Sequence, residues 1–343
     1  MTASIKALRG SAQLAFTAFE GLTESVEQMH ETIARRPMPW SPRPNPPTRA
    51  HGFVAATVYT LVLQAIRGSG KCIDLALGAL PETVAEGVET PRSIRVLAAV
   101  NGVCGDHLEA TDNPLAIPMA IMRDGLPVNP TATELAAAFP DAGPHLALLV
   151  HGLCLSELSW SRKDQPDMGS RLHEALGMTP VYLRYNSGRH ISTNGQELAE
   201  LLHRLLDAWP VPVESLSLVG HSMGGLVIRS GCWYGNKAGR PWLDKLRRVV
   251  YLGTPHHGSP LERAGHLFDL AMRSVQYVEP LMFGRRRSAG IKDLRHGNLL
   301  DEDWAEHDSG RSVADRRCAV PLLDGIDHFF AVASVGRNAH DPR

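Results

Sequence analysis

The stretch Leu-Ser-Leu-Val-Gly-His-Ser-Met-Gly-Gly-Leu-Val-Ile at residues 216–228 decides the fold. An apolar, buried-strand pattern leads into a Gly-x-Ser-x-Gly turn, and small residues then open a helix. This order predicts a nucleophile elbow, in which Ser222 lies in a strained turn at the carboxyl end of a parallel strand. A side chain at Gly220 or Gly224 would collide with the neighbouring strand or helix, so the spacing has a steric cause.

A serine hydroxyl is a poor nucleophile unless other groups receive the negative charge that forms on the attacked carbonyl oxygen. The apolar run 145–150 predicts a second strand, which ends in His151-Gly152-Leu153. In folds with such an elbow, this loop and the residue after the nucleophile each supply one backbone N–H. We therefore expect Leu153 and Met223 to form the oxyanion hole, with Gly152 allowing the loop to approach closely.

Three segments carry a resemblance to the α/β-hydrolase lipase and esterase family, close to the bacterial triacylglycerol lipases and the PGAP1-like GPI inositol-deacylase group. They are Leu-Val-His-Gly-Leu at 149–153, Gly-His-Ser-Met-Gly-Gly at 220–225 and Leu-Gly-Thr-Pro-His-His-Gly-Ser at 252–259. The resemblance implies an α/β-hydrolase fold, with a mainly parallel sheet and helices on both faces. It also implies hydrolysis of a carboxylic ester through an acyl-enzyme on Ser222, with the catalytic groups in the order Ser, Asp or Glu, His.

No motif of the chain places the acid and the histidine of that order. After a strand predicted at 329–335, only eight residues remain. In the lipases that the sequence resembles, the acid follows a strand at this position and the histidine follows one strand later. We therefore favour a chain that is shortened, so that its acid and histidine lie beyond Arg343. The alternative makes 329–335 the last strand and His340 the base, oriented by one of three earlier carboxylates: Asp301, Asp303 or Asp324.

The remaining histidines have simpler interpretations. His151 and His221 lie inside the two motifs, where the family uses them for packing and loop shape. His256 and His257 are adjacent and point in different directions, and no other ligand type stands at a metal-binding spacing, so we expect no metal site. His328 is predicted at the edge of a strand. No cofactor is expected.

Outside the motifs, the spacing of apolar residues and of turn residues predicts the other helices and strands. Residues 92–104 and 195–209 read as helices and 180–185 as a strand, while Asp-Gly at 124–125 predicts a hairpin over 121–128. Strands that alternate with helices favour a mainly parallel sheet. The segment 260–290 is rich in large apolar residues, and a mobile lid and a helix packed on the sheet both remain open.

The N-terminal third predicts separate modules. Residues 1–36 form an amphipathic helix, 37–50 a proline-rich linker, 51–112 a helical region and 113–343 the hydrolase domain, incomplete at its C-terminal end. The apolar stretch 53–66 is too short to span a bilayer, so a buried or docking helix is the default and peripheral attachment to a membrane is the alternative. The apolar stripe of the first helix alternates spacings of three and four: Ile5, Leu8, Ala12, Ala15, Phe19, Leu22, Val26, Met29 and Ile33.

The composition of the chain bears on the class of partner that it binds and on its compartment. The 343 residues carry a net charge of −1, which gives no electrostatic support for binding nucleic acid. The five cysteines are odd in number and widely spaced, which favours reduced thiols in a cytoplasmic protein. The alternative is a cytoplasmic protein that associates with a membrane.

Together these features predict a serine ester hydrolase that acts on apolar or lipid-like small-molecule esters. Two alternatives use the same fold. One is an acyltransferase or thioesterase that employs the same serine. The other is a catalytically inactive hydrolase fold that serves as a binding module.

Overall fold

The computed structural model describes residues 5–34, 46–78, 90–162, 165–258, 287–305 and 317–332. The chain divides into two compact units. The first comprises residues 1–89, 108–115 and 275–286, and it contains the two long N-terminal helices. The second comprises residues 90–107, 116–274 and 287–343, and it contains the sheet.

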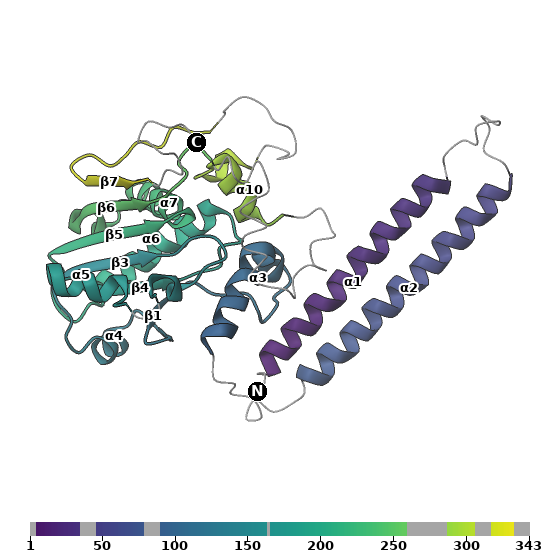
Figure 1. Cartoon of the computed structure of the whole chain (residues 1–343), viewed down its shortest axis with the longest axis horizontal. Coiled ribbons are helices and arrows are strands. Elements are labelled where there is room, and N and C mark those ends of the chain that lie inside the picture. Colours follow the sequence, from purple (N-terminus) through teal and green to yellow (C-terminus); the bar gives the residue numbers. More distant parts are fainter. Residues whose placement is uncertain are drawn as a thin grey trace. The chain divides into compact units, whose positions relative to one another are not determined.

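A seven-stranded sheet in the order β2-β1-β4-β3-β5-β6-β7 forms the centre of the second unit (Figure 1). The five strands from β4 to β7 in this order are parallel to their neighbours, while β1 pairs antiparallel with both β2 and β4. This is the mainly parallel sheet that the sequence predicts. The strands are β1 (Ala120–Arg123), β2 (Leu126–Val128), β3 (His145–Val150), β4 (Thr179–Arg184), β5 (Ser215–His221), β6 (Leu246–Leu252) and β7 (Asp327–Ala331).

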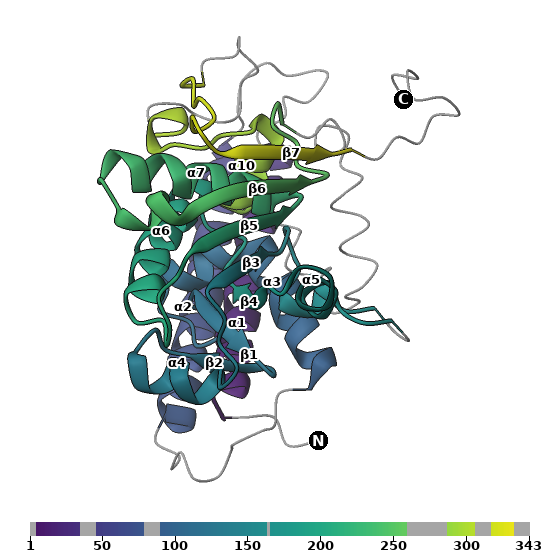
Figure 2. The same ribbon diagram turned by 90° about the vertical axis from the view of Figure 1, so that its left-hand side faces the viewer.

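Helices lie on both sides of this sheet, as expected for the α/β-hydrolase fold. Figure 2 shows α6 and α7 on one side and α5 on the other. The helices of this unit bury apolar faces against the strands, and α6 and α7 pack against each other through Gly195 and Ser230. They are α4 (Ala132–Ala138), α5 (Met168–Leu176), α6 (Ile191–Asp207), α7 (Met223–Lys237) and α10 (Ala289–His296), with short 3-10 turns η2 (Glu157–Trp160), η3 (Pro241–Lys245) and η5 (Asp301–Asp303).

Most of the predicted elements are confirmed within a few residues. Asp124 and Gly125 have φ of 51° and 82°, which is the primed two-residue turn expected between β1 and β2. The last strand was predicted at 329–335, but β7 begins at Asp327 because Asp327 and His328 already pair with Arg248 and Val249 of β6. Residues 333–335 lie outside the described residues, as do residues 260–286 of the segment 260–290 where a lid was considered. The last two residues of that segment begin α10.

The first unit contains an antiparallel pair of helices, α1 (Ile5–Ala34) and α2 (Pro46–Gly78). Arg9 of α1 forms an ion pair with Asp74 of α2 (2.6 Å), and Arg67 of α2 forms one with Glu20 (2.9 Å). Residues 46–50, predicted as linker, are helical, because proline fits the first turn of a helix, where its missing N–H has no partner to lose. Within the described part of the chain, no helix is both long and apolar enough to cross a membrane.

Helix α3 (Pro91–Ala110) was predicted as part of the N-terminal helical region, but residues 90–107 belong to the unit that contains the sheet. A Cβ atom at Gly102 would lie 2.3 Å from Cys154 Sγ, so α3 approaches the loop after β3 closely. The helix is also tied to α10, since Ser288 Oγ donates to Gly102 O (2.7 Å) and Ala289 N donates to Asp106 (3.0 Å). The unit that contains the sheet therefore includes residues 90–107, which precede residue 113.

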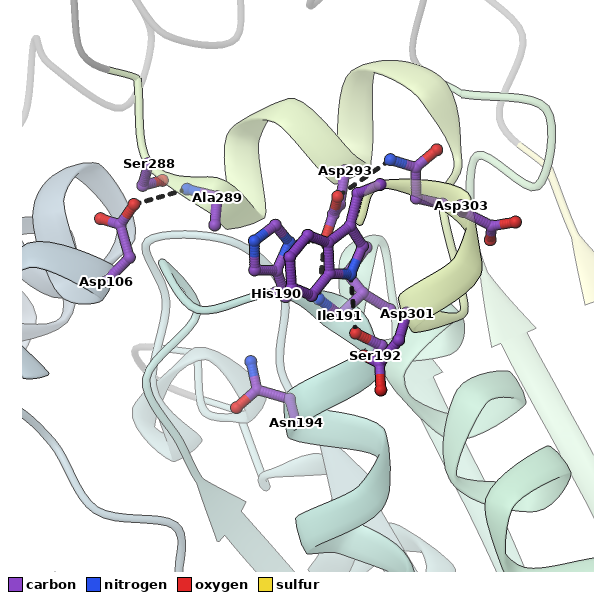
Figure 3. A network of polar contacts seen from close by, with 12 residues as sticks. Asp106, His190, Ile191, Ser192, Asn194, Ser288, Ala289, Asp293, Asp301 and Asp303 are labelled. Atoms are coloured by element: carbon purple, nitrogen blue, oxygen red, sulfur yellow. Dashed lines mark hydrogen bonds and ion pairs between the residues drawn. The ribbon is translucent and has the colours of Figure 1, made fainter. Parts of the chain in front are cut away.

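A buried carboxylate joins α10 to the start of α6 (Figure 3). Asp293 is 1% exposed, and its Oδ2 accepts hydrogen bonds from Ile191 N and His190 Nδ1, both at 2.9 Å. Its Oδ1 accepts from the Asn298 amide at 3.0 Å. Trp304 stacks on His190 with ring centroids 3.6 Å apart. Because His190 makes no capping bond through its own side chain, Asp293 supplies the cap of α6 from a distant part of the chain.

We expect Asp293→Ala to lower the free energy of unfolding by about 3 kcal/mol, because it leaves the Ile191 N–H and the Asn298 amide without their acceptor in the interior. Urea denaturation followed by tryptophan fluorescence measures this. The control is Asp301→Ala, which removes a partly exposed carboxylate bonded to Gln196 and should cost less than about 1 kcal/mol. Equal losses in the two variants would contradict the capping role.

Candidate active site

Ser222 lies between β5 and α7 in a backbone conformation that a non-glycine residue rarely adopts. Its φ is 52° and its ψ is −121°, and such strain costs on the order of 1–3 kcal/mol. Two backbone hydrogen bonds hold it there: Ser222 N donates to Leu252 O (2.8 Å), and Gly225 N donates to Ser222 O (3.1 Å). The turn therefore has the strained geometry that the Gly-x-Ser-x-Gly pattern predicts.

The glycines around Ser222 allow three backbone segments to touch. A Cβ atom at Gly224 would lie 2.3 Å from Val150 O, and one at Gly220 would lie 2.6 Å from the Gly225 Cα. Both distances are far below a normal contact, so the predicted steric cause of the two glycines is confirmed. Without side chains at these positions, the first turn of α7 packs directly on the end of β3.

The loop after β3 lies against the elbow. A Cβ atom at Gly152 would be 3.2 Å from both Ser222 Cβ and His221 O, which is a tight contact. Gly152 O accepts hydrogen bonds from His151 Nδ1 (2.9 Å) and Leu155 N (3.3 Å). Because the C=O and N–H of a trans peptide point in opposite directions, these bonds also fix the direction of the Leu153 N–H.

The two backbone donors predicted for the oxyanion hole are not used elsewhere. Among the described residues, neither Leu153 N nor Met223 N donates a hydrogen bond. Met223 is the first residue of α7, where an N–H has no acceptor within its own helix. The positive end of the helix dipole lies at the same place and favours negative charge.

The structure does not assign a base to Ser222. Its side chain caps no helix and, within the described ranges, forms no hydrogen bond with a histidine. His340 lies outside those ranges. Of the three carboxylates considered as its partner, Asp303 accepts from Leu299 N and Cys318 N, Asp301 accepts from Gln196, and Asp324 is exposed.

His151 is a structural residue, as the sequence predicted. It is fully buried and stacks on Tyr185 with ring centroids 4.3 Å apart. Tyr185 N donates to its Nε2 (3.3 Å), so Nε2 carries no proton and Nδ1 donates to Gly152 O. Burial lowers the pKa of His151 to about 4, so the imidazole is neutral at pH 7. This neutral ring holds the peptide that carries the Leu153 N–H.

The other histidines beside the motifs show no ligand arrangement. Burial also lowers the pKa of His221, whose ring meets Trp160 edge-on. His328 lies on β7, where its Nδ1 is 3.3 Å from the Tyr251 hydroxyl. In the part of the chain that the structure describes, no group of histidine, cysteine and acidic residues could hold a metal ion.

A cavity of about 440 Å³ opens at the carboxyl ends of β6 and β7. It lies beside the elbow, because Thr254 in its wall would touch a Cβ atom placed at Gly225. The sequence analysis did not find this cavity, since four separate segments supply its wall and no local pattern joins them. The lining residues are Arg229, Tyr251, Thr254, His256, His257, Leu322, Phe330, Ala331 and Val332.

Polar atoms in the cavity wall keep unused hydrogen-bonding capacity. Arg229 Nη1 lies 3.2 Å from His256 Nδ1, and since a guanidinium only donates, the imidazole proton is on Nε2. Neither His256 Nε2 nor Thr254 Oγ1 has a partner among the described residues. Burial, then the charges of Arg229 and His257, lower the pKa of His256 to about 4. His256 is thus a neutral donor at neutral pH.

We expect acid to destabilise the fold through His151. Its pKa is about 4 in the folded chain and 6.5 in the unfolded one, so the unfolded state binds the extra proton between these values. The contribution of neutral His151 to the free energy of unfolding is fully present above pH 6.5 and decreases as the pH falls to about 4. Between pH 7 and pH 5 the free energy of unfolding should drop by about 2 kcal/mol. Urea denaturation at both pH values checks this. In His151→Gln the loss should shrink, and an unchanged pH dependence would contradict the assignment.

Comparison with known proteins agrees with this geometry. Residues 183–309 match the model of the PGAP1-like alpha/beta domain family. Among curated proteins, none matches the chain significantly. The solved structures that match include the mature lipase BlEst2 of Bacillus licheniformis, at 21% identity over 46% of this chain and a TM-score of 0.34. The match spans 57% of that lipase's length.

A second structure that matches is a lipase-esterase related protein from Clostridium acetobutylicum, at 13% identity. The match covers 47% of this chain and 69% of that protein, with a TM-score of 0.29. The family match includes α6, β5, the elbow at Ser222 and β6. Residues 183–309, which include the elbow at Ser222, are therefore similar to the PGAP1-like alpha/beta domain family.

Proposed function

We propose that the chain is a serine hydrolase that cleaves carboxylic esters of apolar or lipid-like substrates through an acyl-enzyme on Ser222. The observation that carries the proposal is the strained Ser222, whose Oγ caps no helix, next to two unused backbone donors. Strain of this kind persists only where the surrounding structure fixes it, and it concentrates at functional sites.

In the proposed reaction, Ser222 Oγ attacks the ester carbonyl and its proton passes to a base, for which His340 is the candidate in this chain. The carbonyl oxygen becomes an oxyanion that accepts hydrogen bonds from Leu153 N–H and Met223 N–H. The alcohol leaves with the proton, and water then releases the acid from Ser222 by the same steps in reverse order.

The cavity beside the elbow suits the apolar part of such a substrate. Its wall is mostly aliphatic and aromatic, and its volume of about 440 Å³ is within the range of small-molecule sites. The atoms His256 Nε2 and Thr254 Oγ1 are themselves buried in the wall, so the surface that the cavity offers to a substrate is mainly apolar. An apolar wall favours an apolar ester over a charged substrate.

We expect a fluorophosphonate probe to label the full chain at Ser222, identified by mass spectrometry of the modified peptide. Ser222→Ala should abolish this labelling and lower the hydrolysis of a nitrophenyl ester by about 10³-fold or more. The control is Ser161→Ala, which removes an exposed serine and should leave both signals unchanged. Labelling that persists in Ser222→Ala would contradict the proposal.

Gly224→Ala tests the contact that positions the donors. The new methyl group would lie 2.3 Å from Val150 O and 2.5 Å from His151 O, which forces α7 away from the loop that carries Leu153. We expect labelling and hydrolysis to fall about 100-fold and the free energy of unfolding to drop by about 1–3 kcal/mol.

The control for this variant is Gly21→Ala, because a Cβ atom there meets nothing within 4 Å. It should keep full activity, since the same substitution in open space adds no contact. If Gly224→Ala retained full activity, close contact between α7 and the β3 loop would not be what positions the two N–H groups.

A further inference from the structure

The apolar stripe of α1 is exposed instead of packing on α2. Leu8, Ala15, Phe19 and Val26 are all exposed, with Phe19 at 59%. The side of α1 that meets α2 is the neighbouring one. It presents Arg9 and Gln13 to Asp74, Phe16 to Gly70 and Glu20 to Arg67.

Helix α2 has the same arrangement. Its inward positions, 55, 59, 63, 66, 70 and 74, are half-buried and recur at helical spacing. The apolar residues that precede these positions are exposed, including Val58 at 52%, Val62 at 42% and Ile73 at 41%. Leu61, beside them, is 60% exposed. Both helices of the pair therefore leave a stripe of apolar side chains uncovered.

The two stripes lie on the same side of the helix pair. On α1 each stripe position comes one residue before a position that faces α2, as Leu8 precedes Arg9 and Phe19 precedes Glu20. On α2 Ile73 likewise precedes Asp74. One residue turns a helix by about 100°, and because the helices are antiparallel, equal turns away from their shared seam lead to the same side. The pair thus presents one apolar face two helices wide.

The sequence of this face indicates another helix as its partner. The spacing of three and four residues continues through α1 for four heptads, which is the pattern of a seam between helices. Every seam position of α1 is apolar: one set is Ile5, Ala12, Phe19, Val26 and Ile33, and the other is Leu8, Ala15, Leu22 and Met29.

Charge argues against a lipid surface as the partner. No lysine or arginine occupies the stripe positions of either helix. Arg67 of α2 pairs with Glu20 and Glu24 of α1. Helices that bind anionic membrane surfaces use lysine and arginine for electrostatic attraction, and the apolar face has none of these residues.

The size of the face fits a stable dimer. A 30-residue helix is about 45 Å long, and two helices packed side by side are roughly 20 Å wide. Their common face covers roughly 900 Å², compared with about 800 Å² for each partner in a standard interface.

We propose that the apolar face of the α1–α2 pair binds the same face of a second copy of this chain, which closes a four-helix bundle across a two-fold axis. The face is self-complementary, since each copy presents the same uncharged stripes. This proposal does not depend on the chemistry at Ser222.

Sedimentation velocity of the full chain at micromolar concentration tests the proposal. The wild-type chain should sediment as a dimer, and Phe19→Glu and Val62→Glu should each convert it to a monomer, because each places a charge in the shared face. Thr17→Glu is the matched control, since Thr17 is exposed on the opposite side of α1, and it should remain dimeric. Circular dichroism with unchanged helical signal shows that the variants are folded.

A monomeric wild-type chain would overturn the proposal. So would a dimer that survives Phe19→Glu, and a dimer lost in Phe19→Glu but kept in Val62→Glu would show that α2 does not share the face. Flotation with vesicles of phosphatidylcholine and phosphatidylserine tests whether a membrane is the partner instead. A monomeric chain that floats with vesicles, and no longer does so as Phe19→Glu, would identify a membrane as the partner.

Discussion

The candidate site depends on the absence of a side chain at Gly224. Only a glycine lets the first turn of α7 approach the carbonyl oxygens of Val150 and His151 so closely. This contact brings together two segments that lie more than seventy residues apart in the sequence: the elbow that follows β5 and the loop that follows β3. If α7 were farther from β3, Met223 N and Leu153 N could not reach one oxyanion.

A second layer of contacts fixes the orientation of these donors. His151 holds the Gly152 carbonyl from within the core, and Tyr185 in turn holds His151 through its backbone N–H and its hydroxyl, which donates to His151 O. The depressed pKa of His151 keeps this chain of hydrogen bonds in one protonation state at neutral pH. Burial thus serves the candidate site indirectly: it keeps His151, which precedes Gly152 in the β3 loop, as a fixed, uncharged support.

The elbow and the β3 loop could be predicted from the sequence because each is local: a few consecutive residues determine the turn, and glycine spacing has a steric meaning. The cap of α6 could not, since Asp293 reaches Ile191 across 102 residues and nothing near either residue indicates the pairing. The cavity could not be predicted from the sequence either, because Arg229, Tyr251 and Phe330 of its wall come from three different elements. The start of α2 was misplaced for another reason: a run of prolines breaks a helix interior but is tolerated in its first turn.

The α1–α2 pair and the unit that contains the sheet are stabilised by different interactions. In the sheet, β3 and β5 are buried on both faces, and apolar burial dominates. In the pair, the contact between the helices includes the Arg9–Asp74 and Arg67–Glu20 ion pairs, which contribute little to stability because water screens their exposed side chains. Burial of the exposed stripes would stabilise the pair more than these ion pairs do, since burying a leucine or phenylalanine fully contributes about 1.5–3 kcal/mol. A partner that covers this face would therefore supply stability that the seam between α1 and α2 lacks, so that folding of the pair and association of two copies would be coupled.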